Sequence, residues 1–265
     1  MTMGDTSGGG RHRGGGEAMR WLILPDIHDK LRRANQIIER EPHDRLLLLG
    51  DFFDDFRTGV TDAADTASQV KLWLNDPNTS CLLGNHDMSY GWCRQNRRLL
   101  CPGYDAAKWI AINATVTTGD WQKFKLHAWM ECDRGSWLVS HAGIHPVWLA
   151  GAEPGKYREF IDRACADAWT CLNRGEHHFL LGRGASRSGD QRIGGICWMD
   201  WDELVPIPGL NQLVGHTPDK SVRHKNTKTS RNICLDTNLR NYAVFDGGKL
   251  EIKSYDALMV AAKAR

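Results

Sequence analysis

The sequence predicts an α/β fold in which two sheets pack face to face between flanking helices. In the first ninety residues, short apolar runs alternate with polar stretches whose apolar positions recur at helical spacing. The second half is richer in short strand-like runs. An alternating strand–helix order is typical of a βαβαβ unit with a largely parallel sheet. We therefore expect a βαβαβ core followed by a more β-rich half.

The first half supplies the βαβαβ core. The predicted strands are residues 21–25, 46–49 and 80–83, and the predicted helices are residues 30–40 and 62–75. The first helix has Leu31, Ala34, Ile37 and Ile38 at helical spacing, and the second strand is a run of four leucines that ends in Gly50-Asp51. In parallel sheets, ligands bind beyond the carboxyl ends of the strands, so the residues after each run are the candidates for a site.

The second half supplies further strands and an insertion. The predicted strands are residues 123–129, 136–140, 212–214, 231–236, 242–245 and 250–253. The last two are joined by the turn Asp246-Gly247-Gly248, a sequence that favours a tight hairpin. Residues 154–172 are predicted to form a helix, and residues 180–195, rich in Gly, Ser and Arg, a surface loop.

The domain organisation follows from composition. The chain has 265 residues, 41% of them hydrophobic and 25% charged, which is typical of a globular protein. Residues 1–19 are predicted to be a flexible Gly-rich arm without the apolar core of a signal peptide. Residues 20–265 form one domain with a helical and loop insertion at about 151–200. No apolar run is long enough to cross a membrane, so a membrane partner is not expected.

Charge and cysteine usage bear on partners and location. The net charge is +2, so the sequence does not indicate a nucleic-acid partner. The local basic run at residues 223–231 leaves such a partner open. That run also fits a solvated turn between two strands. The eight cysteines show no C-x-x-C spacing. In a chain of this length they are interpreted as reduced thiols, which predicts a cytoplasmic location.

Five apolar runs are each followed by residues of types that can act as metal ligands. The motifs, in chain order, are Asp26-Ile-His28, Gly50-Asp51, Gly84-Asn85-His86-Asp87, His141-Ala-Gly and Gly215-His216-Thr217. Each motif alone is weak, since such residues also occur in ordinary turns. Their succession at five predicted strand ends indicates a metal centre. Imidazole together with carboxylate or amide oxygen suits divalent transition metals, including manganese.

The ordered motifs resemble those of the calcineurin-like metallophosphoesterase superfamily, across residues 21–253. The phosphoprotein phosphatases and the symmetrical diadenosine tetraphosphatases are the most similar branches. The resemblance implies a four-layer α/β/β/α sandwich with a dinuclear metal centre at the strand ends. It implies that Asp26 and His28 bind the first ion, that Asp51 bridges both, and that Asn85, His141 and His216 complete the second. Two divalent ions are expected, with manganese first and iron, zinc, nickel or cobalt as alternatives.

The resemblance also assigns a general acid. His86 corresponds to the histidine that protonates the leaving group, and Asp54 to the aspartate that orients it. A carboxylate on one imidazole nitrogen fixes the tautomer and supports the imidazolium, as this role requires. A metal-bridging hydroxide is then expected to attack phosphorus. The alternative for Asp54 is a solvated turn acid beside Asp55.

Finer features favour the phosphatase-like branches. The segment HAGIHPVW from His141 resembles a stretch of the diadenosine tetraphosphatases, and Asp236-Thr237 matches a pair found in both branches. Superfamily diesterases more often carry a second histidine where this chain has Pro218.

Two phosphate-binding arginines of the protein phosphatases are missing from their usual places. Asp55 stands at one position, and Met199 and Asp200 follow Trp198 at the other. Substitutes are expected among Arg57, Arg183, Arg187 and Arg192, with solvated loop charge as the alternative. Trp198 and Trp201 fit either a stacking surface for a nucleobase or buried core aromatics.

Three functions remain open on the sequence. The first is hydrolysis of phosphomonoesters or nucleotide phosphoanhydrides, with a phosphorylated small molecule, nucleotide or protein as substrate. The second is a phosphodiesterase of broad specificity, which the missing arginines suggest. The third is a non-catalytic metal-binding scaffold, which the full set of motif residues together with His86 argues against.

Overall fold

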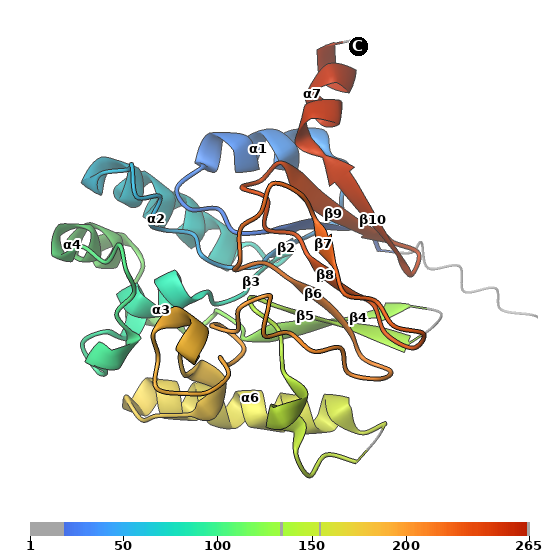
Figure 1. The fold of residues 1–265 in the computed structure, drawn as a ribbon. Coiled ribbons are helices and arrows are strands. Elements are labelled where there is room, and N and C mark those ends of the chain that lie inside the picture. The colour runs from blue at the N-terminus through green and yellow to red at the C-terminus, as the bar shows by residue number, and fades with distance from the viewer. Residues whose placement is uncertain (1–18, 133–134, 154, 264–265) are drawn as a thin grey trace, which may run out of the picture.

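The computed structural model describes residues 19–132, 135–153 and 155–263 (Figure 1). The predicted arm, residues 1–19, lies outside these ranges except for Met19. Within them, two five-stranded sheets pack face to face, with the orders β10-β9-β1-β2-β3 and β4-β5-β6-β8-β7. Helices α1 and α6 lie on opposite sides of the two sheets (Figure 1). The predicted sandwich with a βαβαβ core is therefore confirmed.

The first sheet contains the βαβαβ core. Its strands are β1 (Trp21–Leu24), β2 (Arg45–Leu48), β3 (Thr79–Cys81), β9 (Asn241–Asp246) and β10 (Lys249–Ser254). The first three are parallel, and β9 pairs antiparallel with both β1 and β10. Helices α1 (Leu31–Arg40) and α2 (Val60–Asn75) connect the parallel strands. The Gly247-Gly248 turn between β9 and β10 has positive φ angles of 51° and 76°, which glycine adopts at little cost.

The second sheet is built from β4 (His127–Cys132), β5 (Gly135–Ser140), β6 (Asn211–Val214), β7 (Arg223–His224) and β8 (Asn232–Cys234). Strands β5, β6 and β8 are parallel, whereas β4 and β7 pair antiparallel at the two edges. Each sheet thus contains three neighbouring parallel strands, β1-β2-β3 in the first and β5-β6-β8 in the second, and their carboxyl ends point toward a common edge of the sandwich.

Alternating side chains of the strands form two cores. Ile23 and Leu47 face Val139 and Leu213 of the other sheet, all with no exposed surface. The neighbours Leu22 and Leu48 face the helices, where they pack with residues such as Ile37 of α1. Because the central strands are covered on both faces, their sequences are continuous apolar runs.

Five further helices occur in the described ranges. They are α3 (Asn85–Trp92), α4 (Ala106–Thr115), α5 (Thr118–Trp121), α6 (Tyr157–Arg174) and α7 (Tyr255–Lys263). Short 3-10 turns occur at Arg97–Leu99, Pro146–Leu149, Phe179–Leu181 and Ala185–Arg187. None of the helices in the described ranges has the length and hydropathy needed to cross a bilayer.

Three sequence expectations differ in detail from the structure. The strand expected at 123–129 begins at His127, because Phe124 and Leu126 pack in the core while Lys125 forms a single bridge with Leu82 at the end of β3. The loop expected at 180–195 is not wholly at the surface, since Leu180 and Leu181 are buried. The helical part of the predicted insertion is α6, which begins at Tyr157 rather than near residue 154.

Candidate metal centre

The six predicted ligands lie at the carboxyl ends of five strands. Asp26 and His28 follow β1, Asp51 follows β2, and Asn85 begins α3 after β3. His141 directly follows β5, and His216 follows β6. Since these five strands end at one edge of the sandwich, residues far apart in the sequence meet there. All are buried except His28, which is partly exposed.

The first group of donors is Asp26, His28 and Asp51, whose ligand atoms lie within 4.8 Å of one another. The Nδ1 of His28 donates to the carbonyl oxygen of Phe53 at 2.8 Å. Its Nε2 therefore faces the cluster, 3.8 Å from Oδ2 of Asp51. A backbone carbonyl that fixes one imidazole nitrogen is the usual way of orienting a metal-binding histidine.

The second group is Asp51, His141 and His216, again with ligand atoms within 4.8 Å. His141 donates from Nδ1 to the carbonyl oxygen of Leu49 at 2.8 Å. Its Nε2 lies 3.3 Å from Oδ2 of Asp51 and 3.1 Å from Oδ1 of Asn85. The carboxylate of Asp51 thus belongs to both groups, and the amide oxygen of Asn85 extends the second.

Close packing of the backbone holds this arrangement. A Cβ on Gly84 would lie 2.1 Å from Oδ1 of Asp51, and a Cβ on Gly215 would lie 2.0 Å from Oδ1 of Asp26, so only glycine fits at either position. His28, Asp51 and His216 have positive φ angles of 43°, 48° and 69°. Such strained conformations in non-glycine residues are concentrated at functional sites.

The electrostatics of the cluster favour a positive charge between the donors. Burial and the nearby carboxylate of Asp51 raise the pKa of Asp26 to about 6. Burial alone would lower the pKa of His141, but Asp51 and Asp26 outweigh it and raise this pKa to about 10. Burial and the neighbours His141 and Arg187 hold the pKa of His216 well below its ordinary value. A neutral His216 is in the form that binds a metal.

The residues present fit divalent cations. The Nε2 of His216 is buried and has no hydrogen-bond partner among the described residues. A buried polar atom without a partner is costly, and a cation at this edge would supply the partner. The donor set of imidazole nitrogens with carboxylate and amide oxygens is the mixture that transition metals accept.

A histidine–carboxylate pair stands beside the donors. The Nδ1 of His86 lies 3.0 Å from Oδ2 of Asp54, and the ring of His86 is 5.2 Å from that of His28. The other oxygen of Asp54 accepts from the hydroxyl of Tyr90 at 2.6 Å and from Nζ of Lys108 at 3.4 Å. Burial lowers the pKa of His86, but Asp51 and Asp54 outweigh it and raise the pKa. Asp54 is fully buried and paired, so the interpretation as a solvated turn acid is wrong.

The four candidate arginines differ in their contacts. Arg187 forms an ion pair with Asp200 at 2.7 Å and contacts Oγ1 of Thr217, the residue after His216, at 3.3 Å. Arg57 is exposed and, together with His28, lines a groove on the protein surface. Arg183 instead donates to the carbonyl of Leu100 and lies over the ring of Trp198 at 4.5 Å. Arg192 is exposed, and its side chain makes no hydrogen bond or ion pair with another described residue.

Several residues of the site were not assigned a role from the sequence. Asp87 accepts from the backbone N–H groups of Asp51, Phe52 and Gly84, at 2.7, 2.9 and 2.9 Å. Asp236 follows β8, and burial together with the charge of Asp26 raises its pKa to about 7. Asp87 and Asp236 lie in the motifs G-N-H-D and D-T, so the sequence did contain a signal that could have pointed to them. The contact of Lys108 with Asp54 had no such signal.

Trp198 and Trp201 are core residues. Their side chains are 4% and 5% exposed, which confirms the core interpretation and leaves no free face for a nucleobase. The exposed aromatic near the site is Phe56, whose ring lies 6.4 Å from that of His86.

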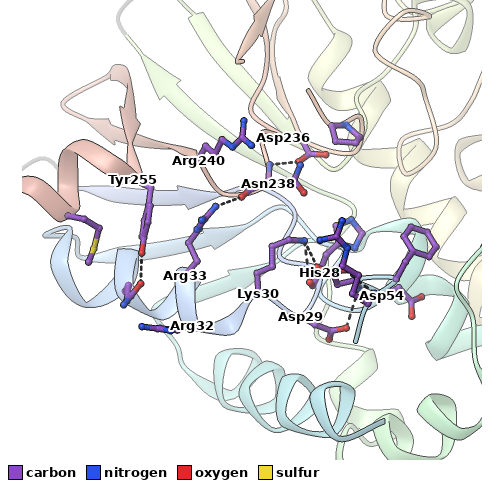
Figure 2. A pocket seen from close by; sticks show the side chains of 16 residues that line it. His28, Asp29, Lys30, Arg32, Arg33, Asp54, Asp236, Asn238, Arg240 and Tyr255 are labelled. Carbon is purple, nitrogen blue, oxygen red and sulfur yellow. Dashed lines mark hydrogen bonds and ion pairs between the residues drawn. The ribbon is translucent and has the colours of Figure 1, made fainter. Parts of the chain in front are cut away.

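A groove of about 1150 Å³ opens from the metal centre (Figure 2). His28, Asp54 and Lys30 lie at one side of it, and Arg33, Arg240 and Tyr255 at the other (Figure 2). Lys30 pairs with Asp55 at 3.3 Å. Of the six predicted ligands, His28 lines this groove, together with Asp54, the partner of His86.

The fold and this donor set define the class of the protein as a metal-binding α/β/β/α sandwich. A family model described as calcineurin-like phosphoesterase matches residues 19–219, about three quarters of the chain. The chain belongs to the calcineurin-like phosphoesterase family. The predicted resemblance to that superfamily is thereby confirmed.

Two solved structures show the same fold at low identity. The cold-active protein-tyrosine phosphatase of the psychrophile Shewanella sp. is 15% identical, with a TM-score of 0.56, over 90% of this chain and 78% of that chain. A mutant of a cold-active protein tyrosine phosphatase is 16% identical, with a TM-score of 0.55 and the same coverage of both chains, 90% and 78%. No curated protein sequence matches the chain.

Proposed function

We propose that this protein is a metal-dependent phosphoesterase that hydrolyses phosphomonoesters or nucleotide phosphoanhydrides. The observation that carries the proposal is the position of Asp51, whose carboxylate belongs to two groups of metal donors beside the His86–Asp54 pair. A carboxylate shared between two donor groups is what a two-metal centre requires, and a nearby acid is what ester cleavage requires.

The donors divide between two ions. Asp26 and His28 would hold the first ion, Asp51 would hold both, and Asn85, His141 and His216 would hold the second. Divalent cations held there supply Lewis-acid chemistry, since they lower the pKa of bound water and neutralise charge on phosphoryl oxygens. We propose manganese, because the donors mix nitrogen and oxygen. The eight free cysteines agree with a cytoplasmic location.

The protein's own residues orient and protonate the substrate. His86 donates a proton to the oxygen of the leaving group, while Asp54 holds its Nδ1 at 3.0 Å and stabilises the imidazolium. Tyr90 and Lys108 fix Asp54 in turn. Among the four candidate arginines, we assign phosphate contact to Arg187 and Arg57, and the contact of Arg187 with Thr217 and the position of Arg57 in the groove support this assignment.

The test is manganese-dependent hydrolysis of four substrates. These are p-nitrophenyl phosphate, bis-p-nitrophenyl phosphate, diadenosine tetraphosphate and a phosphopeptide, with the Asp51→Asn variant beside the wild type. Turnover that disappears in the variant supports the proposal, and the preferred substrate identifies the class. Preference for the diester would favour a phosphodiesterase. Absence of turnover with any divalent ion would contradict the proposal and favour a metal-binding scaffold.

A further inference from the structure

The groove beside the metal centre has two parts that differ in charge. The inner part adjoins His28 and Asp54, and the outer part extends along α1 to α7 (Figure 2). We define the outer part by six lining residues: Arg32, Arg33, Gln36, Asn238, Arg240 and Tyr255. It contains three arginines and no carboxylate, whereas the inner part contains aspartates.

The aspartates that line the groove are already engaged near the metal centre. Asp29 accepts from the hydroxyls of Thr58 and Thr66 at 2.6 and 2.8 Å. Asp55 pairs with Lys30, and Asp54 holds His86. None of these carboxylates neutralises an arginine of the outer part, so the positive charge there is left for another group.

Arg33 is held in place by neutral groups. Its Nη1 donates to the carbonyl oxygen of Asn238 at 3.0 Å, and its guanidinium lies over the ring of Tyr255 at 4.8 Å. The hydroxyl of Tyr255 is itself held by the side chain of Gln36. Within the described residues, neither Arg33 nor Arg240 forms an ion pair. A fixed guanidinium with free donors and no counter-ion is preorganised to bind an anion.

The outer part lies close to the proposed reaction centre. Asn238 is two residues after Asp236, which is about 7 Å at most along an extended chain. The N–H of Asn238 donates to Asp236 at 3.2 Å, so the loop that carries Asn238 and Arg240 starts at the metal centre (Figure 2). These loop residues and Tyr255 follow residue 219, where the family match ends, so this wall belongs to the unmatched part of the chain.

We propose that the outer part of the groove binds a second phosphate of the substrate, so that the substrate is a small molecule with a linear chain of phosphates. This inference rests on the proposed function, because it places the scissile phosphate at the metal centre. Arg33 binds the distal phosphate with its free donors, and Arg240 and Arg32 add charge at the rim. Arginine suits this role because its planar fork binds phosphate oxygens in pairs.

The test compares anions that differ in phosphate number. Inorganic phosphate and inorganic tripolyphosphate are measured as inhibitors of p-nitrophenyl phosphate hydrolysis, with free manganese held constant because phosphate chains bind it. The variant is Arg240→Glu, an exposed residue whose side chain forms no hydrogen bond or ion pair within the described part of the chain. The control is Arg163→Glu, an exposed arginine of α6 on the far side of the sandwich.

The proposal predicts a selective effect. Arg240→Glu raises the inhibition constant of tripolyphosphate about tenfold, since it puts a negative charge in place of a positive one beside the distal phosphate, and like charges repel. The constant for phosphate and the KM for p-nitrophenyl phosphate change less than about twofold in the same variant. Arg163→Glu leaves all of them unchanged. Equal tripolyphosphate constants in the two variants would overturn the proposal.

Additional measurements distinguish the remaining outcomes. If the wild type hydrolyses nothing, the dissociation constant of tripolyphosphate is measured by calorimetry on the manganese-loaded protein. Weaker binding of tripolyphosphate to Arg240→Glu would then support phosphate binding by the outer part, although the proposed function had failed. Unchanged binding would overturn the proposal. ATP as inhibitor distinguishes a nucleoside polyphosphate from an inorganic chain. An acidic phosphopeptide that is weakened while tripolyphosphate is not would overturn the proposal in favour of a protein substrate.

Discussion

The two ends of strand β1 bury carboxylates in opposite ways. Near Arg20, which precedes the strand, Glu41 is 4% exposed and accepts from Arg20, Tyr242 and Lys253 at 2.8, 2.7 and 2.8 Å. Burial raises the pKa of Glu41, but these three partners outweigh it and lower the pKa overall. The chain thus neutralises this carboxylate with its own residues.

At the other end, neither of the buried carboxylates of Asp26 and Asp87 forms an ion pair with a lysine or arginine in the described ranges. Burial and the charge of Asp51 raise the pKa of Asp26 to about 6 and that of Asp87 to about 7. Buried charges without partners are costly, so a protein keeps them where they serve another purpose. The comparison indicates that the end near Glu41 stabilises the fold, whereas the end near Asp26 is organised to bind cations.

The largest expected effect is on function, at the end near Asp26. His86→Gln should lower kcat for phenyl phosphate by about 10²–10⁴-fold, because general acid catalysis contributes about that much. The loss should be smaller for p-nitrophenyl phosphate, whose leaving group needs less protonation. Steady-state kinetics on both esters tests this, with thermal unfolding as the control for folding. Equal losses on both esters would argue against His86 as the acid.

The next effect is on stability, at the end near Glu41. Glu41→Gln should lower the free energy of unfolding by about 3 kcal/mol, because it leaves Arg20 and Lys253 without their shared partner. Glu39→Gln is the matched control, since Glu39 is exposed and pairs only with Arg40 at 3.4 Å. Denaturant unfolding measures both. If Glu41→Gln abolished hydrolysis and left stability unchanged, the conclusion that the end near Glu41 serves to stabilise the fold would be wrong.

The pH dependence of stability follows from the lowered pKa of Glu41. The folded state binds this proton more weakly than the unfolded state, whose pKa is near 4.5. The stabilisation is therefore complete above about pH 4.5 and is lost as the pH falls through the lower folded pKa. The difference in unfolding free energy between wild type and Glu41→Gln should shrink between pH 5 and pH 3. A difference that grows toward acid pH would contradict this account.

The smallest effect expected is at Arg187. Arg187→Ala should raise KM for a phosphomonoester by roughly tenfold, because one charge-assisted contact to phosphate is lost. Asp200→Asn releases the same arginine without removing it and should have a smaller effect. The kinetics of Arg192→Ala serve as the control, since that side chain is exposed. If all three variants match the wild type, Arg187 does not bind substrate.

The sequence was most informative where strands end in polar residues. The runs before Asp26, Asp51 and His141 were short but clearly apolar, so both the parallel strands and the residues after them were predictable. Family resemblance then supplied the pairing of donors, which spacing alone does not contain. The structure brings the same six residues together, and their metal-binding roles remain a prediction.

The sequence was least informative about residues that only the tertiary fold brings together. Lys108 is 7% exposed on α4 and contacts Asp54, 54 residues away, which no local pattern encodes. The outer part of the groove joins Arg33 of α1 to the loop at Asn238 and to Tyr255 of α7, so it exists only after folding. Of the four predicted arginines, sequence position gave no means of separating Arg187 from Arg192.

The most direct test of the central claim is the manganese content of the full chain after exhaustive dialysis against a metal-buffered solution. We expect two ions per chain for the wild type and for Glu41→Gln, and fewer than two for Asp51→Asn. Binding should also raise the unfolding temperature, because a ligand of the folded state stabilises it by mass action. Equal metal content in Asp51→Asn and the wild type, or no bound ion in either, would contradict the central claim.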